Sequence, residues 1–204
     1  MSKKYVWYVG YGSNLSKQRF LCYIVGGIPK YGKKYKGGCS DTNCPIDDKP
    51  IKIPYSLYFA LPNGYTKTDN WGEGGVAFIN PIKEENKDYW SLCRMWKITC
   101  EQYEEVRDQE GKSWYNHEIY LGEEGGISIR TITNKIALTN ILQPSDTYIK
   151  TVALGLKETF GFGDDAIAAY LTEKEGLKRF TKDTLIDVFK SVTSSNNRLK
   201  GWKK

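Results

Sequence analysis

The chain of 204 residues has a single histidine, only two methionines and no long hydrophobic run. A membrane-spanning helix needs ~20 consecutive apolar residues, and no stretch approaches that length. The start Met1-Ser2-Lys3-Lys4 lacks the apolar segment of a secretion signal. His117 has no second histidine at metal-ligand spacing. We therefore expect a cytoplasmic protein with no membrane partner.

The cysteines are few, odd in number and irregularly spaced. They are Cys22, Cys39, Cys44, Cys93 and Cys100. Cys39 and Cys44 could hold half of a metal site, but the sequence offers no second half. Free thiols, mostly buried in a reducing compartment, are therefore the better interpretation, and we expect no metal and no cofactor.

Hydrophobic residues make up 40% of the chain and aromatic residues 14%, enough for the core of one folded domain. The net charge of +6 is concentrated at the ends, since residues 1–40 carry eight lysines and arginines and no acid. Arginine, the usual reader of bases, is scarce, with six residues against twenty-four lysines. The pattern favours a solvated lysine-rich surface, and we expect no nucleic-acid partner.

Residues 5–9 have high strand propensity and lead into a loop, Gly10-Tyr11-Gly12-Ser13-Asn14. Ser16 can then cap a helix that runs to about Val25. A strand, a tight glycine loop and a helix N-terminus together direct free backbone N–H groups at one place, which suits an anion.

The rest of the sequence predicts several short strands and few helices. Strands are expected at 55–61, 74–79 and 90–98, with a hairpin of 115–121 and 127–133; helices are expected at 100–110, 144–160, 164–171 and 181–192. Residues 30–52 are expected to form a long irregular excursion. Many short strands favour a barrel-like sheet.

Glu110 is the candidate catalytic residue that position alone singles out. It follows Tyr103 and Val106 on the apolar face of its helix, and it lies at the helix C-terminus. Burial and the helix dipole both disfavour a charged carboxylate there, which suits a general base near neutral pH. A carboxylate that merely hydrogen-bonds a neighbouring strand, or turns to solvent, is an equal alternative on these grounds.

Ser13 and the glycine loop also allow other functional interpretations. Ser13 lacks a Gly-x-Ser-x-Gly elbow and a suitably placed histidine, which disfavours a hydrolytic triad. Gly10-x-Gly12 lacks the third glycine of a dinucleotide fingerprint. By itself, such a loop is as often structural as functional.

The segment Tyr8-Val9-Gly10-Tyr11-Gly12-Ser13-Asn14-Leu15 resembles the substrate loop of the gamma-glutamylcyclotransferase-like family. Residues 74–79 resemble the glycine-rich strand of that family. Residues 106–111, followed by Tyr115, resemble its catalytic-glutamate segment, and residues 144–158 resemble its closing helix. The resemblance spans about residues 5–172.

The resemblance implies an α+β fold: a small mixed, closed or partly open β-barrel with flanking helices. It implies a domain over residues 1–172, with 173–204 as a basic helical extension of the same domain or an appended tail. The implied activity is intramolecular acyl transfer on a small-molecule γ-glutamyl amide, giving 5-oxoproline and an amine or amino acid, with no cofactor. The alternative is a non-catalytic module that binds a glutamyl-like ligand, and a homodimer is left open.

The resemblance also implies a role for each matching residue. Glu110 would be the general acid/base. The substrate-binding residues would be Tyr8, Val9, Gly10, Tyr11, Gly12, Ser13, Asn14, Tyr115 and Tyr148.

Overall fold

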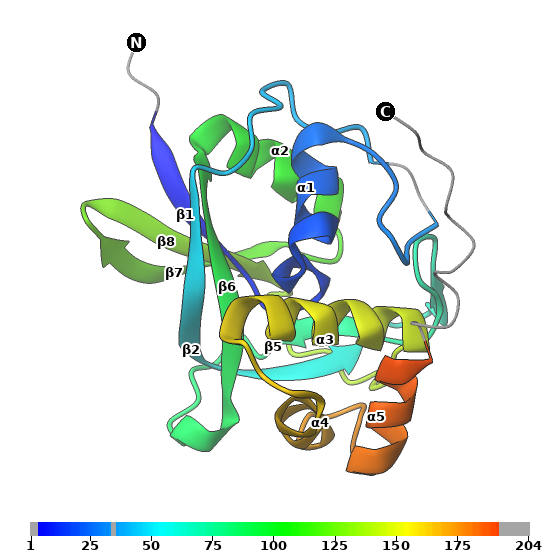
Figure 1. Cartoon of the computed structure of the whole chain (residues 1–204). Helices are drawn as coiled ribbons and strands as arrows, with labels where there is room; N and C mark the ends of the chain where they lie inside the picture. The colour runs from blue at the N-terminus through cyan, green and yellow to red at the C-terminus, as the bar shows by residue number, and fades with distance from the viewer. Residues whose placement is uncertain (1–3, 34–35, 192–204) are drawn as a thin grey trace.

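The computed structural model describes residues 4–33 and 36–191, which form a mixed six-stranded sheet flanked by α-helices (Figure 1). The strands of this sheet are β1 (Tyr5–Gly10), β2 (Asp47–Ala60), β5 (Val76–Ile79), β6 (Trp90–Thr99), β7 (His117–Glu124) and β8 (Ile127–Thr133). The α-helices are α1 (Lys17–Val25), α2 (Cys100–Glu110), α3 (Asp146–Phe160), α4 (Asp164–Thr172) and α5 (Lys182–Lys190). A two-stranded ribbon of β3 (Lys67–Thr68) and β4 (Gly72–Glu73) and two 3-10 turns, η1 (Ser13–Leu15) and η2 (Lys87–Tyr89), complete the described part. The predicted α+β class is confirmed.

The predicted closure into a barrel is not confirmed, because the sheet is open. Its strand order is β5-β2-β6-β1-β8-β7, so β5 and β7 are the edges among the described residues. The sheet curls enough for Thr133 of β8 to donate a hydrogen bond from Oγ1 to the Ile79 carbonyl of β5, at 2.7 Å. Because this contact comes from a side chain and not from a backbone ladder, it joins the two strands without closing the sheet.

The predicted irregular excursion over 30–52 is wrong at its C-terminal end. Strand β2 begins at Asp47, eight residues before the expected strand, and pairs with β6 from Asp47 to Ile53. The first half of this strand was not predicted because it contains lysine, aspartate and proline, which are rare in strands. Pro50 is tolerated because β5 pairs only with the far half of β2, which leaves the first half at an edge.

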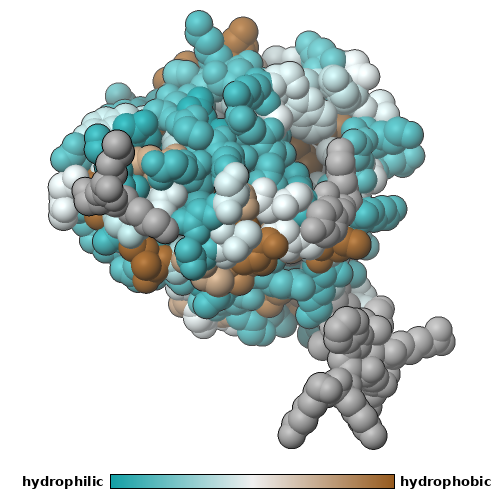
Figure 2. All heavy atoms as spheres, turned by 90° about the horizontal axis from the view of Figure 1, so that it is seen from above, coloured by the Kyte–Doolittle hydropathy of each residue, from teal (hydrophilic) through white to brown (hydrophobic). Residues whose placement is uncertain are grey.

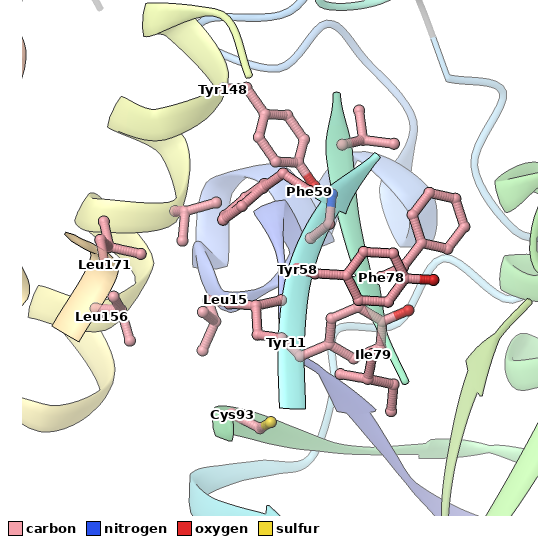
Figure 3. Close-up of a cluster of buried hydrophobic side chains, with 14 of the residues drawn as sticks. Tyr11, Leu15, Tyr58, Phe59, Phe78, Ile79, Cys93, Tyr148, Leu156 and Leu171 are labelled. Atoms are coloured by element: carbon pink, nitrogen blue, oxygen red, sulfur yellow. Dashed lines mark hydrogen bonds between the residues drawn. The ribbon is translucent and has the colours of Figure 1, made fainter. Parts of the chain in front are cut away.

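Both faces of the central strand β1 are covered, and its alternating residues belong to two separate apolar clusters. Val6 and Tyr8 pack with α1 and α2. Trp7 and Val9 belong to the larger cluster, which β2, β5, β6 and helices α3 to α5 complete. Figure 3 shows part of this larger cluster, where Tyr148 projects from α3 toward Phe59 on β2.

The segment after α4 packs on the same core. Leu177 and Leu185 are fully buried, and the Phe59 amide donates to the Glu175 carbonyl at 2.9 Å. The remainder of the predicted extension, residues 192–204, lies outside the described residues.

The face of the molecule shown in Figure 2 is mainly hydrophilic, with apolar residues in small separate patches. Within residues 4–33 and 36–191, no helix is both long enough and apolar enough to cross a membrane.

Candidate active site

The loop that follows β1 is held by two side chains from the neighbouring strand β6. Trp96 donates from Nε1 to the Asn14 carbonyl at 3.0 Å, and Arg94 donates from Nη1 to the Leu15 carbonyl at 3.2 Å. Arg94 is itself buried and paired with Asp48 and Glu158. The backbone of the loop is therefore held in a defined position, in part by a buried arginine whose charge is balanced by two carboxylates.

Two glycines allow this loop to approach its neighbours closely. A Cβ on Gly12 would lie 2.7 Å from the Ala77 Cβ and 2.8 Å from the Tyr148 hydroxyl oxygen. On α3, a Cβ on Gly155 would lie 2.4 Å from the Leu15 Cβ. Only glycine leaves room at these contacts, so both residues bring α3 and β5 against the loop.

Glu110 is the last residue of α2, as predicted. Thr99 caps the helix through a reciprocal bond with Gln102, and Gly111 ends it with a φ of 93°. The Glu110 side chain is half-buried and accepts a hydrogen bond from Asn14 Nδ2 at 2.5 Å. The same Asn14 nitrogen donates to the Tyr8 hydroxyl at 3.0 Å, so the loop and the carboxylate meet directly.

Asn14 has one unused polar atom at this junction. Its Oδ1 is buried and has no hydrogen-bond partner. A buried acceptor without a partner is unfavourable, and a donor brought by a ligand would relieve the cost.

A small cavity of about 30 Å³ lies between the loop, α2, β5 and α3. The predicted site residues that line it are Tyr8, Gly10, Tyr11, Gly12, Ser13, Asn14, Glu110, Tyr115 and Tyr148, joined by Ala77 and Ile132. Val9 is placed elsewhere: its side chain is in the core, and its carbonyl accepts from Thr131. The cavity has room for about two water molecules, or for a small polar group.

The tyrosine hydroxyls around this inner cavity differ in how they are used. Tyr11 donates to the Ile132 carbonyl at 2.7 Å, and Tyr115 donates to the Ala77 carbonyl at 3.0 Å. The Tyr8 hydroxyl accepts from Asn14, and the Tyr148 hydroxyl accepts from the Ala77 amide at 3.0 Å, so both retain a proton to donate.

Burial keeps these phenols neutral. It raises the pKa of Tyr8 far above its ordinary value, and the charge of Glu110 adds to the shift. Burial also raises the pKa of Tyr148 to about 12, although hydrogen bonds from the Ala77 and Ser13 backbone oppose the shift. Glu110 is the only carboxylate among the residues that line the inner cavity.

A larger outer cavity of about 480 Å³ adjoins the inner one and shares Ser13, Glu110, Tyr115 and Tyr148 with it. Arg19 and Tyr23 of α1 line this outer cavity, and the sequence prediction missed both. Their spacing of four residues places them on one face of the helix, which is the signal that could have identified them. Burial raises the pKa of Tyr23 well above its ordinary value. The positive charge of Arg19 opposes this shift, whereas the negative charge of Glu110 and the hydrogen bond between Tyr23 and Glu110 raise the pKa further.

Comparison with known proteins shows which fold this is. An uncharacterized human protein superposes with a TM-score of 0.58 at 19% identity, over 92% of this chain and 99% of that chain. A gamma-glutamyl cyclotransferase superposes with a TM-score of 0.57, at the same identity and coverage. The chain therefore has the gamma-glutamyl cyclotransferase fold, and the family resemblance is confirmed at that level.

One further relative is found by sequence. The chain is 30% identical to histone deacetylase 5 of Arabidopsis thaliana, over 209 aligned positions that cover 84% of this chain. The match spans 31% of the deacetylase, about a third of its length. No family model matches the chain.

Proposed function

We propose that this chain, which has the gamma-glutamyl cyclotransferase fold, is an enzyme that cyclises the glutamyl group of a γ-glutamyl amide to 5-oxoproline. The observation that carries the proposal is the junction of Glu110 with Asn14 at the wall shared by the two cavities. There a carboxylate base lies beside an unpartnered amide oxygen and beside neutral phenol donors.

In the proposed reaction, the α-ammonium of the glutamyl group enters the inner cavity and donates to Glu110 and to Asn14 Oδ1. Glu110 takes one proton, and the freed α-amine attacks the γ-carbonyl carbon of the same molecule. The bond between this carbon and the leaving nitrogen then breaks. Glu110 returns its proton to that nitrogen as the bond breaks. The second proton that the ring nitrogen still carries then passes, again by way of Glu110, to the released amine, so the products are 5-oxoproline and an ammonium ion.

Ring closure within one molecule explains how so few groups suffice. Holding the glutamyl group in a folded pose supplies several kcal/mol that a bimolecular reaction would lack. The Tyr8 and Tyr148 protons, together with backbone N–H groups of the Tyr11-Gly12-Ser13 turn, would hold the polar groups of the substrate. This chemistry calls for no metal and no cofactor.

The test is the release of 5-oxoproline from a panel of γ-glutamyl amides by the wild-type chain and by Glu110→Gln. Glutamine can still accept the hydrogen bond from Asn14 but is not a base, so kcat should fall by about 10²–10⁴-fold. The matched control is Glu104→Gln, an exposed carboxylate on the same helix that pairs with Arg107, and it should leave kcat unchanged.

Two results would overturn the proposal. The first is the absence of 5-oxoproline with every amide of the panel, and binding without turnover would then favour the non-catalytic module. The second is a Glu110→Gln variant that keeps its activity.

A further inference from the structure

A third cavity, of about 350 Å³, lies between the second half of β2, the turns after β5 and α4, and the segment that leads into α3. It shares no lining residue with the inner and outer cavities of the candidate active site. Its volume is in the range of small-molecule sites. It is lined by Ser56, Leu57, Tyr58, Asn80, Glu84, Tyr89, Ala137, Leu138, Ile141, Glu173, Lys174, Glu175 and Lys178.

Lys174 is the one charged residue of this lining that is buried, with 4% of its surface exposed. Its Nζ lies 4.2 Å from the centre of the Tyr170 ring. Within residues 4–33 and 36–191, this amine makes no ion pair and no hydrogen bond. A buried charge is costly unless it is paired and hydrogen-bonded, so the cavity contains a cation without a counter-ion.

The carboxylates of the lining do not fill that role. Glu84 accepts a hydrogen bond from the Asn86 amide at 3.0 Å, and Glu175 is paired with Lys178. Glu173 is exposed and makes no ion pair with Lys174.

The surroundings of Lys174 disfavour its charge. Burial, followed by the positive charge of Lys52 on β2, lowers the pKa of Lys174 to about 8. The nearby ring of Tyr170 supplies no negative oxygen, because its phenol is kept neutral by burial, which raises its pKa. A negative group bound in the cavity would pair with the amine and would offset both effects.

The rest of the lining is suited to an apolar ligand with one polar end. Leu57 and Tyr58 are buried, and Ile141 and Tyr89 are partly exposed. The Tyr58 hydroxyl accepts from the Leu138 amide at 2.9 Å, so it retains a proton to donate. The cavity therefore offers an ammonium group and a phenol to an anion, and aliphatic and aromatic surface to the remainder of a ligand.

We infer that this cavity binds a small apolar carboxylic acid, with the carboxylate paired to Lys174 and the apolar body against Leu57 and Ile141. A monovalent carboxylate matches a single buried cation, whereas a phosphate dianion would need further charged donors. The inference does not depend on the proposed cyclotransferase function.

The experiment compares the binding of two probes of equal shape, 3-phenylpropionate and 3-phenylpropionamide, by calorimetry at pH 7. The wild-type chain should bind the acid roughly 10- to 100-fold more tightly than the amide, as expected for a hydrogen bond between charged groups. Lys174→Met should reduce this preference to near unity, and it should fold because an apolar chain of similar length replaces an unpaired charge.

Two control variants locate the binding. Lys182→Met removes an exposed lysine that is not part of the lining, and it should leave the preference unchanged. Arg19→Gln removes the buried cation of the outer cavity, and it should also leave the preference unchanged.

A measurement at pH 9 gives a second test. With a pKa of about 8, Lys174 of the unliganded chain is mostly neutral at pH 9, so the affinity for the acid should fall about 10-fold from pH 7 to pH 9. The affinity for the amide should not change. The other groups that face Lys174 are Lys52 on β2, Cys93 on β6, Tyr170 on α4 and the neighbouring Glu173. Burial raises the pKa of both Cys93 and Tyr170, so neither should ionise in this range.

Four results would refute the inference. Equal affinity of the wild-type chain for acid and amide, or binding of neither probe at millimolar concentration, would exclude a carboxylate site. A preference that survives in Lys174→Met would exclude Lys174 as its cation. Loss of the preference in Arg19→Gln would place the acid in the outer cavity instead.

Discussion

Replacement of Gly12 by alanine tests whether close packing of the loop against β5 holds the site together. The added Cβ would lie 2.7 Å from the Ala77 Cβ and 2.8 Å from the Tyr148 hydroxyl oxygen, well inside ordinary contact distance. Either the loop moves or β5 and Tyr148 move. Both changes disturb the cavity, since Gly12, Ala77 and Tyr148 all line it.

The size of the effect follows from these two contacts. An extra methyl group in a packed interior costs about 1–3 kcal/mol. For a domain of this length, each kcal/mol lowers Tm by about 2–4 °C, so Gly12→Ala should lower Tm by about 2–12 °C. Ala77→Gly removes one of the two clashing atoms, at its own cost of about 0.5–1 kcal/mol for glycine in a strand. The double variant should lose about 1 kcal/mol less stability than the two single losses added together, because one of the two close contacts is gone. The rescue is partial because the contact with Tyr148 remains.

The assay is thermal and urea unfolding of the wild-type chain, the two single variants and the double variant, with 5-oxoproline release measured in parallel. Gly37→Ala is the matched control, because a Cβ there meets nothing within 4 Å, and it should be additive with Ala77→Gly. Additivity of Gly12→Ala with Ala77→Gly to within about 0.3–0.5 kcal/mol would refute the proposed contact.

Two other substitutions test the packing of α3 against the loop and the burial of a lysine elsewhere in the core. Gly155→Ala should lower the free energy of unfolding by about 1–3 kcal/mol, because the new Cβ would lie 2.4 Å from the Leu15 Cβ. Both Tm and kcat/KM should therefore fall, and unchanged values of both would contradict this expectation. Burial, with a contribution from the charge of Lys52, lowers the pKa of Lys174 from 10.5 to about 8. At pH 7 the buried lysine is charged, which lowers the free energy of unfolding. This destabilisation is lost as the pH rises from about 8 to 10.5. Lys174→Met should therefore stabilise the chain at pH 7 by up to about 3 kcal/mol and by less at pH 10, in urea unfolding at both pH values, whereas a gain independent of pH would contradict the assignment. The exposed Lys182→Met is its control.

Helices, strands and turns that are specified by their own residues could be predicted from the sequence. The strand, loop and helix around Gly12 follow from propensity and from glycine, and the end of α2 at Glu110 follows from the Thr99 cap and Gly111. The start of β2 at Asp47 could not be read in this way. Its prolines and charges are compatible with a strand only at an edge, and which strands are edges is decided by the whole sheet.

Local patterns in the chain specify where the turns and helix ends lie, and these patterns identified Glu110 and the loop from Tyr11 to Asn14 as separate candidates. Their contact became evident in the folded structure, because Asn14 and Glu110 are 96 residues apart and meet through the packing of α2 on β1. The folded structure also decided that the sheet stays open and that Arg19 points into a cavity instead of solvent. A local pattern records the period of one helix or strand, whereas a site depends on which faces meet, and that depends on every element of the core.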